Sequence, residues 1–253
     1  MEKLLPQNFD ILVNNAVKKF WSTRSTSNNS SQEGSRGSVI AGKNLDGFSE
    51  IIKTVAYYCG VTENEIIITG KKQLTLPGYY RPTKIWDSLI IYKGRLIAAF
   101  ELKSQVGSFG NNFNNRSEES IGSAHDFWTA YREEAFDISN SSIIGQKGDI
   151  TKPPFLGYLM LLEDCNESAT PVKLEEEHFK VFPEFLNSSY AKRYQILCEK
   201  LVKEGLYSSA SLILSPRESG KTLGTYKSPT VELSPKSLFS DFASKILAAK
   251  ELY

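Results

Sequence analysis

Two adjacent predicted strands carry the charged side chains that could do chemistry. Asp87 lies in the apolar run at residues 85–92, and Glu101 and Lys103 lie in the run at residues 95–103. Glu101 and Lys103 are two positions apart, so in a strand they project from one face, about 6.6 Å apart at the backbone. Charged residues are rarely buried in a strand unless they are paired or bind a metal. The pattern therefore indicates a buried site that needs a counter-charge.

Two carboxylates at the end of a sheet suit Mg²⁺, a hard cation that takes oxygen ligands and keeps several waters. Asp87 and Glu101 are the expected ligands, and the Leu102 carbonyl could add a third. Such a metal polarises a phosphate and activates the attacking water. Lys103 would orient that water, stabilise developing charge, or act as a base if burial lowers its pKa. Together these residues indicate a phosphodiester hydrolase.

The connection between the two strands decides whether the acids can meet. A two-residue turn at Lys93 and Gly94 with regular pairing sets Asp87 opposite Phe100, which leaves Asp87 and Glu101 on opposite faces. An odd-length loop, or a bulge in one strand, puts both acids on the same face. We therefore expect one of these two features, and a regular two-residue turn would count against the site.

A simpler interpretation of the same residues stays open. Asp87 would then be a surface residue at a strand end, and Glu101 and Lys103 an ordinary solvated ion pair.

The segment after Lys103 is unusually rich in asparagine, and it contains one arginine. Asparagine can pair with adenine through two hydrogen bonds, and arginine can do the same with guanine. A turn-rich loop that uses Asn and Gly for left-handed backbone conformations is the alternative. Tyr79, Tyr80 and Arg81 form a further possible DNA contact. The expected DNA-binding residues are Gln105, Asn111, Asn112, Asn114, Asn115 and Arg116.

The remaining pattern predicts a mixed α/β fold with a central sheet flanked by helices, because the strand runs are apolar on both faces. The polar, serine-rich stretch at residues 22–38 predicts a flexible loop. A chain of 253 residues fits a single domain over residues 1–253. Helices are expected at residues 8–21, 44–60, 118–136, 184–206 and 236–252, and strands at 65–69, 85–92, 95–103, 155–162 and 210–214.

Composition excludes several classes of protein. No apolar run approaches the ~18–20 residues of a membrane span, and the N-terminal residues lack signal-peptide features, so we expect a cytoplasmic protein. Cys59, Cys165 and Cys198 are too few and too widely spaced for a disulfide framework or a CxxC zinc site. The net charge is +1, but residues 71–105 have seven basic and two acidic residues, and residues 163–187 have two basic and seven acidic. We expect the acidic stretch to face away from DNA.

The run Phe100-Glu-Leu-Lys-Ser-Gln-Val-Gly-Ser-Phe-Gly-Asn-Asn-Phe-Asn-Asn-Arg-Ser-Glu-Glu119, with the preceding strand around Trp86-Asp87, resembles the type II restriction endonucleases of the XhoI group. The resemblance extends over most of the chain. It implies a homodimeric, Mg²⁺-dependent endonuclease of the PD-(D/E)xK fold that cuts double-stranded DNA within a palindromic hexamer, CTCGAG for the group's namesake.

By this resemblance, Asp87, Glu101 and Lys103 match the catalytic motif, and Trp86 stands where the motif often has proline. In the superfamily, a helix such as residues 44–60 can send a glutamate towards the metal. Glu50 is therefore a possible supporting residue, and a solvated helix glutamate is the alternative.

A site-specific DNA endonuclease is thus the expected function. A palindromic target demands a two-fold dimer, with the helices at 118–136 or 184–206 as possible faces. Two alternatives stay open. One is a DNA repair or junction-resolving nuclease of the same fold without sequence discrimination, and the other is a non-catalytic DNA-binding module.

Overall fold

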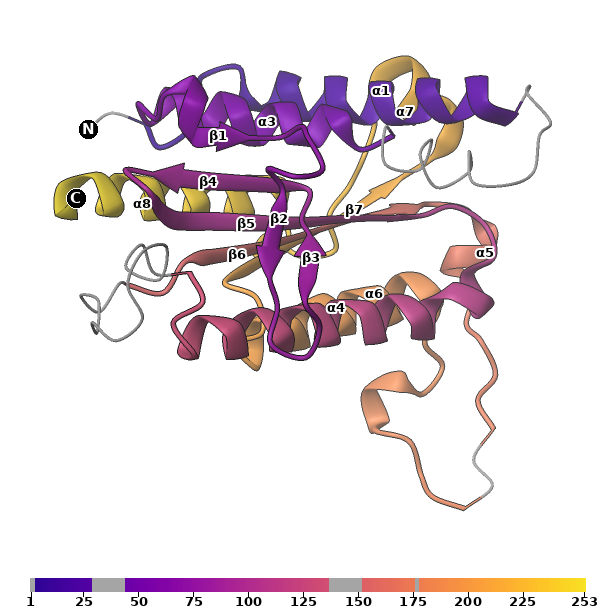
Figure 1. Ribbon diagram of the computed structural model, residues 1–253. Coiled ribbons are helices and arrows are strands. Elements are labelled where there is room, and N and C mark those ends of the chain that lie inside the picture. Colours follow the sequence, from indigo (N-terminus) through magenta and orange to yellow (C-terminus); the bar gives the residue numbers. More distant parts are fainter. Residues whose placement is uncertain (1–2, 29–43, 137–151, 176–177) are drawn as a thin grey trace.

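The computed structural model describes residues 3–28, 44–136, 152–175 and 178–253. A five-stranded mixed sheet with strand order β1-β4-β5-β6-β7 forms its centre (Figure 1). The β1, β4 and β5 strands pair antiparallel, whereas β5, β6 and β7 pair parallel. The strands are β1 (Ile66–Ile67), β4 (Ser88–Tyr92), β5 (Arg95–Gln105), β6 (Phe155–Glu163) and β7 (Ser209–Ser215). A separate antiparallel pair, β2 (Thr75–Pro77) and β3 (Thr83–Ile85), leads into β4.

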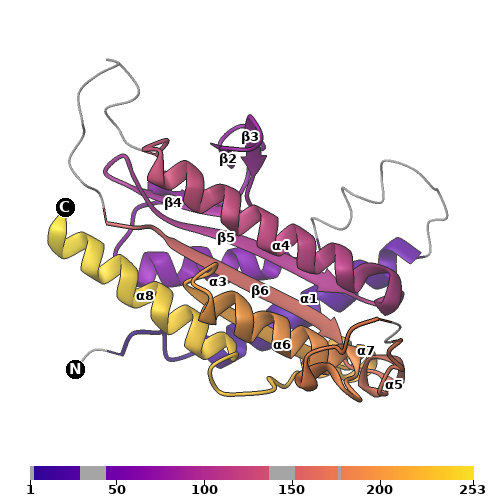
Figure 2. The same cartoon turned by 90° about the horizontal axis from the view of Figure 1, so that it is seen from below.

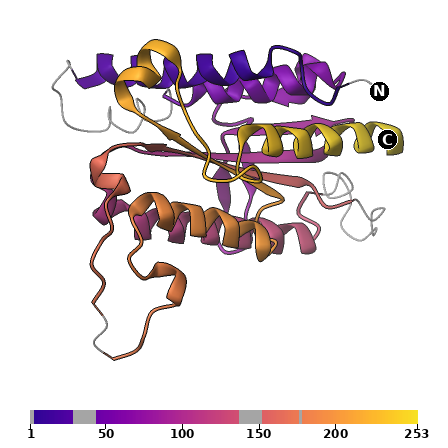
Figure 3. The same ribbon diagram turned by 180° about the vertical axis from the view of Figure 1, so that it is seen from behind.

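Helices cover both faces of the sheet, which confirms the mixed α/β architecture predicted from the sequence. On one face lie α1 (Phe9–Asn28), α3 (Asp46–Tyr58) and α8 (Pro235–Leu252), and on the other lie α4 (Phe109–Arg132) and α6 (Tyr190–Lys203) (Figures 1 and 2). Figure 3 shows α8 next to α1 and α3 on their side of the sheet. The short helical elements are η1 (Glu63–Glu65), α5 (Asn166–Ala169), η3 (Pro183–Phe185) and α7 (Arg217–Leu223).

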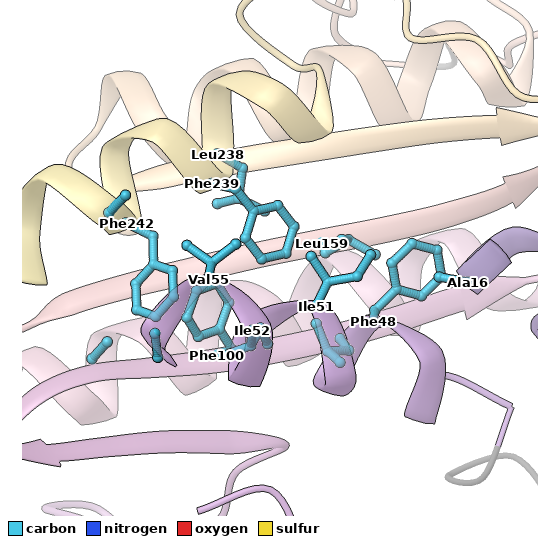
Figure 4. Packing of buried hydrophobic residues seen from close by; sticks show 14 of the residues in the cluster. Ala16, Phe48, Ile51, Ile52, Val55, Phe100, Leu159, Leu238, Phe239 and Phe242 are labelled. Atoms are coloured by element: carbon cyan, nitrogen blue, oxygen red, sulfur yellow. The ribbon is translucent and has the colours of Figure 1, made fainter. Parts of the chain in front are cut away.

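The first core fills the space between the sheet and α1, α3 and α8 (Figure 4). Phe100 lies at its centre, with its ring edge-to-face against Phe242 at 4.9 Å between centroids. Gly157 on the neighbouring strand leaves room for the Phe100 ring, because a Cβ there would lie 2.5 Å from a ring carbon. Phe100 and Leu102 are both buried in this core, as expected for residues that alternate with Glu101.

The second core lies between the sheet and α4 and α6. All nine residues of β6 are buried, so this strand is covered on both faces, as parallel strands usually are. Glu101 and Lys103 project towards this second layer, on the same side of β5 as Ala99. The β5 strand therefore separates an apolar face from a face that carries charge.

Several predicted boundaries were wrong. The α1 helix continues to Asn28, so residues 22–28 of the predicted flexible loop are helical, and residues 29–38 lie outside the described residues. The α4 helix begins at Phe109 instead of residue 118, because Phe109 and Phe113 pack against Tyr190. This packing outweighs the low helix propensity of asparagine.

Two further predicted boundaries differ at strand and helix starts. Only Ile66–Ile67 of the predicted strand at 65–69 pairs with the sheet. The α6 helix begins at Tyr190 instead of residue 184, after Ser189 caps it by accepting a hydrogen bond from the Lys192 amide. Among the described helices, none has the length and apolar character to cross a membrane.

Candidate active site

The turn between β4 and β5 contains two residues, Lys93 and Gly94. Both have positive φ, 48° and 78°, as a type I′ turn requires. Next to the turn the pairing is regular, with Tyr92 opposite Arg95. A two-residue turn alone would have placed the acids on opposite faces.

A bulge in β5 corrects the register. Ile91 lies opposite Leu96, but Ile90 lies opposite Ala98, so Ile97 is an extra residue. Both Ile97 and Ala98 are buried in the first core. The predicted bulge is therefore confirmed.

Beyond the bulge the acids meet on one face. Ser88 pairs with Phe100, which places Asp87 opposite Glu101 at the end of β4. Directly opposed residues of an antiparallel pair project from the same face.

Glu101 lies between two lysines. Its side chain is only 2 % exposed. Lys103 Nζ lies 2.6 Å from Glu101 Oε1, and Lys84 Nζ lies 2.7 Å from Glu101 Oε2. Burial alone would raise the pKa of Glu101, but the two ammonium groups outweigh burial and hold the pKa below its ordinary value. The ion pair predicted as the simpler alternative exists, but it is buried and not solvated.

Asp87 stands in a different environment. Its Oδ2 accepts a hydrogen bond from the Leu102 amide at 2.7 Å. Burial, and then the negative charge of Glu101, raise the pKa of Asp87 to about 6. Two neighbouring carboxylates whose pKa values are driven apart are typical of a functional site.

Lys103 is protonated in this arrangement. Burial lowers its pKa, but the charges of Glu101, Asp87 and Glu119 outweigh burial and raise the pKa above its ordinary value. The structure therefore favours an ammonium that donates hydrogen bonds over a neutral amine that acts as a base.

The donor set fits a magnesium ion. The Asp87 amide donates to the Phe100 carbonyl, so the carbonyl of Leu102, two residues on, projects from the same edge of β5 past the end of β4. Two carboxylates and this carbonyl are hard oxygen donors. No cluster of three or more His, Cys, Asp or Glu residues suited to a metal occurs in the described part of the chain. Waters and phosphate oxygens would have to complete the coordination, which Mg²⁺ commonly accepts.

Sequence reasoning gave no individual role to Lys84 or Glu119. Lys84 precedes Asp87 by three residues, and its Nζ lies 4.6 Å from the ring centroid of Trp86. Glu119 on α4 lies 3.7 Å from Lys103 Nζ, and it also pairs with Arg116 at 2.7 Å. A basic residue two positions before the Trp86-Asp87 pair was the available signal for Lys84. Nothing in the sequence indicated that Glu119 lies beside Lys103.

The predicted DNA-binding residues separate into two groups. Gln105 is buried, and its side-chain amide donates to the Gly107 carbonyl. The side-chain amide of Asn112 donates to the Ser108 carbonyl, so both side chains already have local partners. Asn111, Asn114 and Asn115 are exposed on one side of α4. They belong to the first turns of a helix, and the loop considered as an alternative is therefore wrong.

Arg116 lies near the acidic site, whereas Glu50 lies on the other side of the sheet. Arg116 is half-buried, and its buried Nε has no hydrogen-bond partner among the residues that the structure describes. Glu50 is exposed and lines a groove between α1 and α3, on the side of the sheet that Phe100 faces. The structure thus does not bring Glu50 to Asp87 and Glu101.

The tip of the β2–β3 hairpin lies beside α4. Buried Asp126 accepts hydrogen bonds from the Tyr79 and Tyr80 amides, both at 2.8 Å, and forms an ion pair with Arg81 at 2.8 Å. The side chains of both tyrosines are exposed, Tyr80 by 66 %. An open depression next to the tip is lined by Tyr80, Arg81, Glu118, Glu119, Gly122, Ser123, His125 and Asp126.

Comparisons with known proteins identify the family of the chain. The chain matches the family described as "Restriction endonuclease XhoI" over residues 24–228. It is 48% identical over 206 residues to the type II restriction enzyme BstVI of Geobacillus stearothermophilus, covering 79% of this chain and 85% of that protein. It is 44% identical over 230 residues to the type II restriction enzyme XhoI of Xanthomonas vasicola, covering 88% of each.

A third relative is the type II restriction enzyme AbrI of Azospirillum brasilense, which is 44% identical over 173 residues, or 65% of this chain and 71% of that protein. No solved structure matches the chain. With the family match spanning most of its residues, this chain belongs to the XhoI family of type II restriction endonucleases.

Proposed function

We propose that this protein is a Mg²⁺-dependent homodimer that hydrolyses double-stranded DNA within a palindromic hexamer similar to CTCGAG. The placement of Asp87 and Glu101 on one face of the β4–β5 hairpin, with Lys103 paired beside them, carries the proposal. The three cysteines Cys59, Cys165 and Cys198 are unpaired, which fits action in the reducing cytoplasm.

The proposed chemistry assigns a role to each side chain. Asp87, Glu101 and the Leu102 carbonyl would hold Mg²⁺, which polarises the scissile phosphate and activates water when bound. Lys103, protonated and fixed by Glu101, would orient the attacking water and stabilise negative charge on the phosphate. Its raised pKa makes this role a better fit than that of a base.

Recognition would come from α4. A helix fits the major groove of DNA, where asparagine discriminates adenine through two hydrogen bonds. Asn111, Asn114 and Asn115 are exposed on adjacent turns and supply such groups. Glu119 of the same helix pairs with both Arg116 and Lys103, so base contacts and catalysis would share one element. Gln105 and Asn112 would support the start of α4 by their local hydrogen bonds.

A magnesium-dependent digest of a plasmid of known sequence, followed by mapping of the fragment ends, tests this proposal. We expect discrete ends inside a CTCGAG-like palindrome. Glu101→Gln and Lys103→Ala should each reduce cleavage about 100-fold or more, because each removes several kcal/mol of transition-state stabilisation. Binding of the target DNA should persist in Lys103→Ala.

The alternatives give different results in the same experiment. Cleavage without sequence preference, or only at branched DNA, would indicate a repair or junction-resolving nuclease. Binding without any cleavage would indicate a non-catalytic module. Unchanged cleavage in both variants would contradict the proposed site.

A further inference from the structure

The proposed mechanism gives no role to Lys84, although this lysine touches the centre of the site. Its side chain is 13 % exposed, and its Nζ lies 2.7 Å from Glu101 Oε2. Both oxygens of Glu101 are therefore occupied by ammonium groups, Oε1 by Lys103 and Oε2 by Lys84. A cation that uses Glu101 as a ligand must displace one of them.

Charge balance in the cluster explains why a second lysine is present. Asp87 and Glu101 bring two negative charges, and Lys84 and Lys103 bring two positive charges. Buried charges without partners are strongly unfavourable, so the lysines stabilise the two acids when no metal is bound. A divalent ion would supply the same two positive charges, so neither lysine would be needed as a counter-charge to the two acids. Lys103 would still have Glu119 as an acidic partner, which leaves Lys84 in excess.

Of the two lysines that contact Glu101, Lys84 is the one that a metal ion can displace more easily. The contact of Lys84 with Glu101 Oε2 is close, but this oxygen makes no hydrogen bond of good geometry among the described residues. Lys103 lies on the central strand β5, whereas Lys84 lies on β3, which pairs only with β2 outside the main sheet. Lys103 also has a second acidic partner, Glu119, whereas the second contact of Lys84 is with the uncharged ring of Trp86.

We propose that Lys84 occupies the metal-facing oxygen of Glu101 in the metal-free enzyme and moves to a backbone phosphate of the bound DNA when the divalent ion takes its place. This inference depends on the proposed metal site. Without the metal, Lys84 balances the negative charge of the two acids. With the metal bound, Lys84 adds its positive charge to the DNA-binding side. Metal binding and phosphate binding are thereby coupled through one side chain.

The test is Mn²⁺ binding to the full-length protein without DNA, followed by electron paramagnetic resonance of the free ion. Mn²⁺ shares the preference of Mg²⁺ for carboxylate and carbonyl oxygens. Lys84→Met removes the competing cation and should bind Mn²⁺ at least about tenfold more tightly than the unaltered protein. Lys84→Arg keeps the charge and should bind no more tightly than the unaltered protein. Lys236→Met, which alters an exposed lysine on α8, is the control and should leave the Mn²⁺ affinity unchanged.

Two further measurements distinguish a specific effect of Lys84→Met from misfolding of the variant. Thermal unfolding of Lys84→Met should show a lower midpoint without metal and a larger rise on adding Mn²⁺ than the unaltered protein shows. With saturating Mg²⁺, Lys84→Met should cleave target DNA about tenfold or more slowly, because the phosphate contact is lost.

The outcomes separate this inference from the proposed function. Equal Mn²⁺ affinity in Lys84→Met and the unaltered protein, at a site that Glu101→Gln abolishes, would overturn the role of Lys84 and leave the metal site intact. Binding that Glu101→Gln does not affect, or no binding in either protein, would overturn the metal site itself and this inference with it.

Discussion

Asp87, a proposed metal ligand, lowers the stability of the folded protein when its side chain is ionised. Its pKa is about 6 in the folded chain, against an ordinary value of 3.8. The folded, metal-free protein therefore binds this proton more tightly than the unfolded chain does, and its stability falls as the pH rises from about 4 to about 6. Since one pKa unit corresponds to 1.36 kcal/mol, ionised Asp87 costs up to about 3 kcal/mol above this range.

We predict that Asp87→Asn abolishes cleavage and stabilises the metal-free protein at pH 7.5 by up to about 3 kcal/mol. The amide oxygen can still accept the hydrogen bond from the Leu102 amide, and no charge is buried. Below pH 4, where Asp87 is protonated in both the folded and the unfolded chain, the two proteins should have the same free energy of unfolding. Denaturant unfolding in a chelator at several pH values measures this. Asp241→Asn, an exposed change on α8, is the control and should be neutral. Lower stability of Asp87→Asn at both pH extremes would contradict the prediction.

At the scale of elements, the β4–β5 hairpin and the second half of α4 were predictable, but the start of α4 at Phe109 was not. The sequence contains a two-residue turn signal at Lys93-Gly94 and two acids that can share a metal only if they project from the same face. Only a bulge in one strand, or a loop of odd length, puts both acids on that face. The start of α4 depends on aromatic contacts between segments far apart in the chain, such as Phe113 with Tyr194. Local propensity could not reveal these contacts, so the Asn-rich segment did not look helical. The sequence showed a basic residue before Trp86-Asp87, but only the fold reveals that Lys84 reaches Glu101.

The β2–β3 tip offers an element-scale prediction. Asp126 on α4 holds three groups of the tip, and its pKa lies below the ordinary value, because the hydrogen bonds from Tyr80, Arg81 and Tyr79 outweigh its burial. Asp126→Ala should lower the free energy of unfolding by about 2–4 kcal/mol and speed hydrogen exchange at the Tyr79 and Tyr80 amides. Ser123→Ala removes only a 3.4 Å contact with Arg81 and serves as the matched control. Unchanged exchange in Asp126→Ala would show that the tip is held by other contacts.

At the scale of the molecule, charge is unevenly distributed. Acidic groups of the 163–187 stretch are partly neutralised by internal ion pairs, such as Glu163 with Arg217 and Asp164 with Lys227. In Figure 2 the β2–β3 hairpin projects beyond α4 on one side, and α5 lies on the α6 side of the molecule. This arrangement does not settle the prediction that DNA approaches α4 and the hairpin while the acidic stretch faces away, because Glu163 accepts a hydrogen bond from the Gly107 backbone amide just before α4 begins. That prediction stays open until DNA contacts are measured.

A dimer with one catalytic site per subunit gives the last prediction. The protein should sediment at about twice 28.3 kDa, because a palindrome presents the same half-site to two subunits related by two-fold symmetry. Each subunit has one set of Asp87, Glu101 and Lys103, so each should cut one strand. Mixed dimers of unaltered and Asp87→Asn subunits, purified through two different tags, should therefore nick a supercoiled plasmid and stop at the open circle. Unaltered dimers should proceed to linear DNA, and dimers of two Asp87→Asn subunits should leave the plasmid intact. If mixed dimers produced linear DNA as fast as unaltered dimers, one subunit would be cutting both strands, and the assignment of one strand to each site would be wrong.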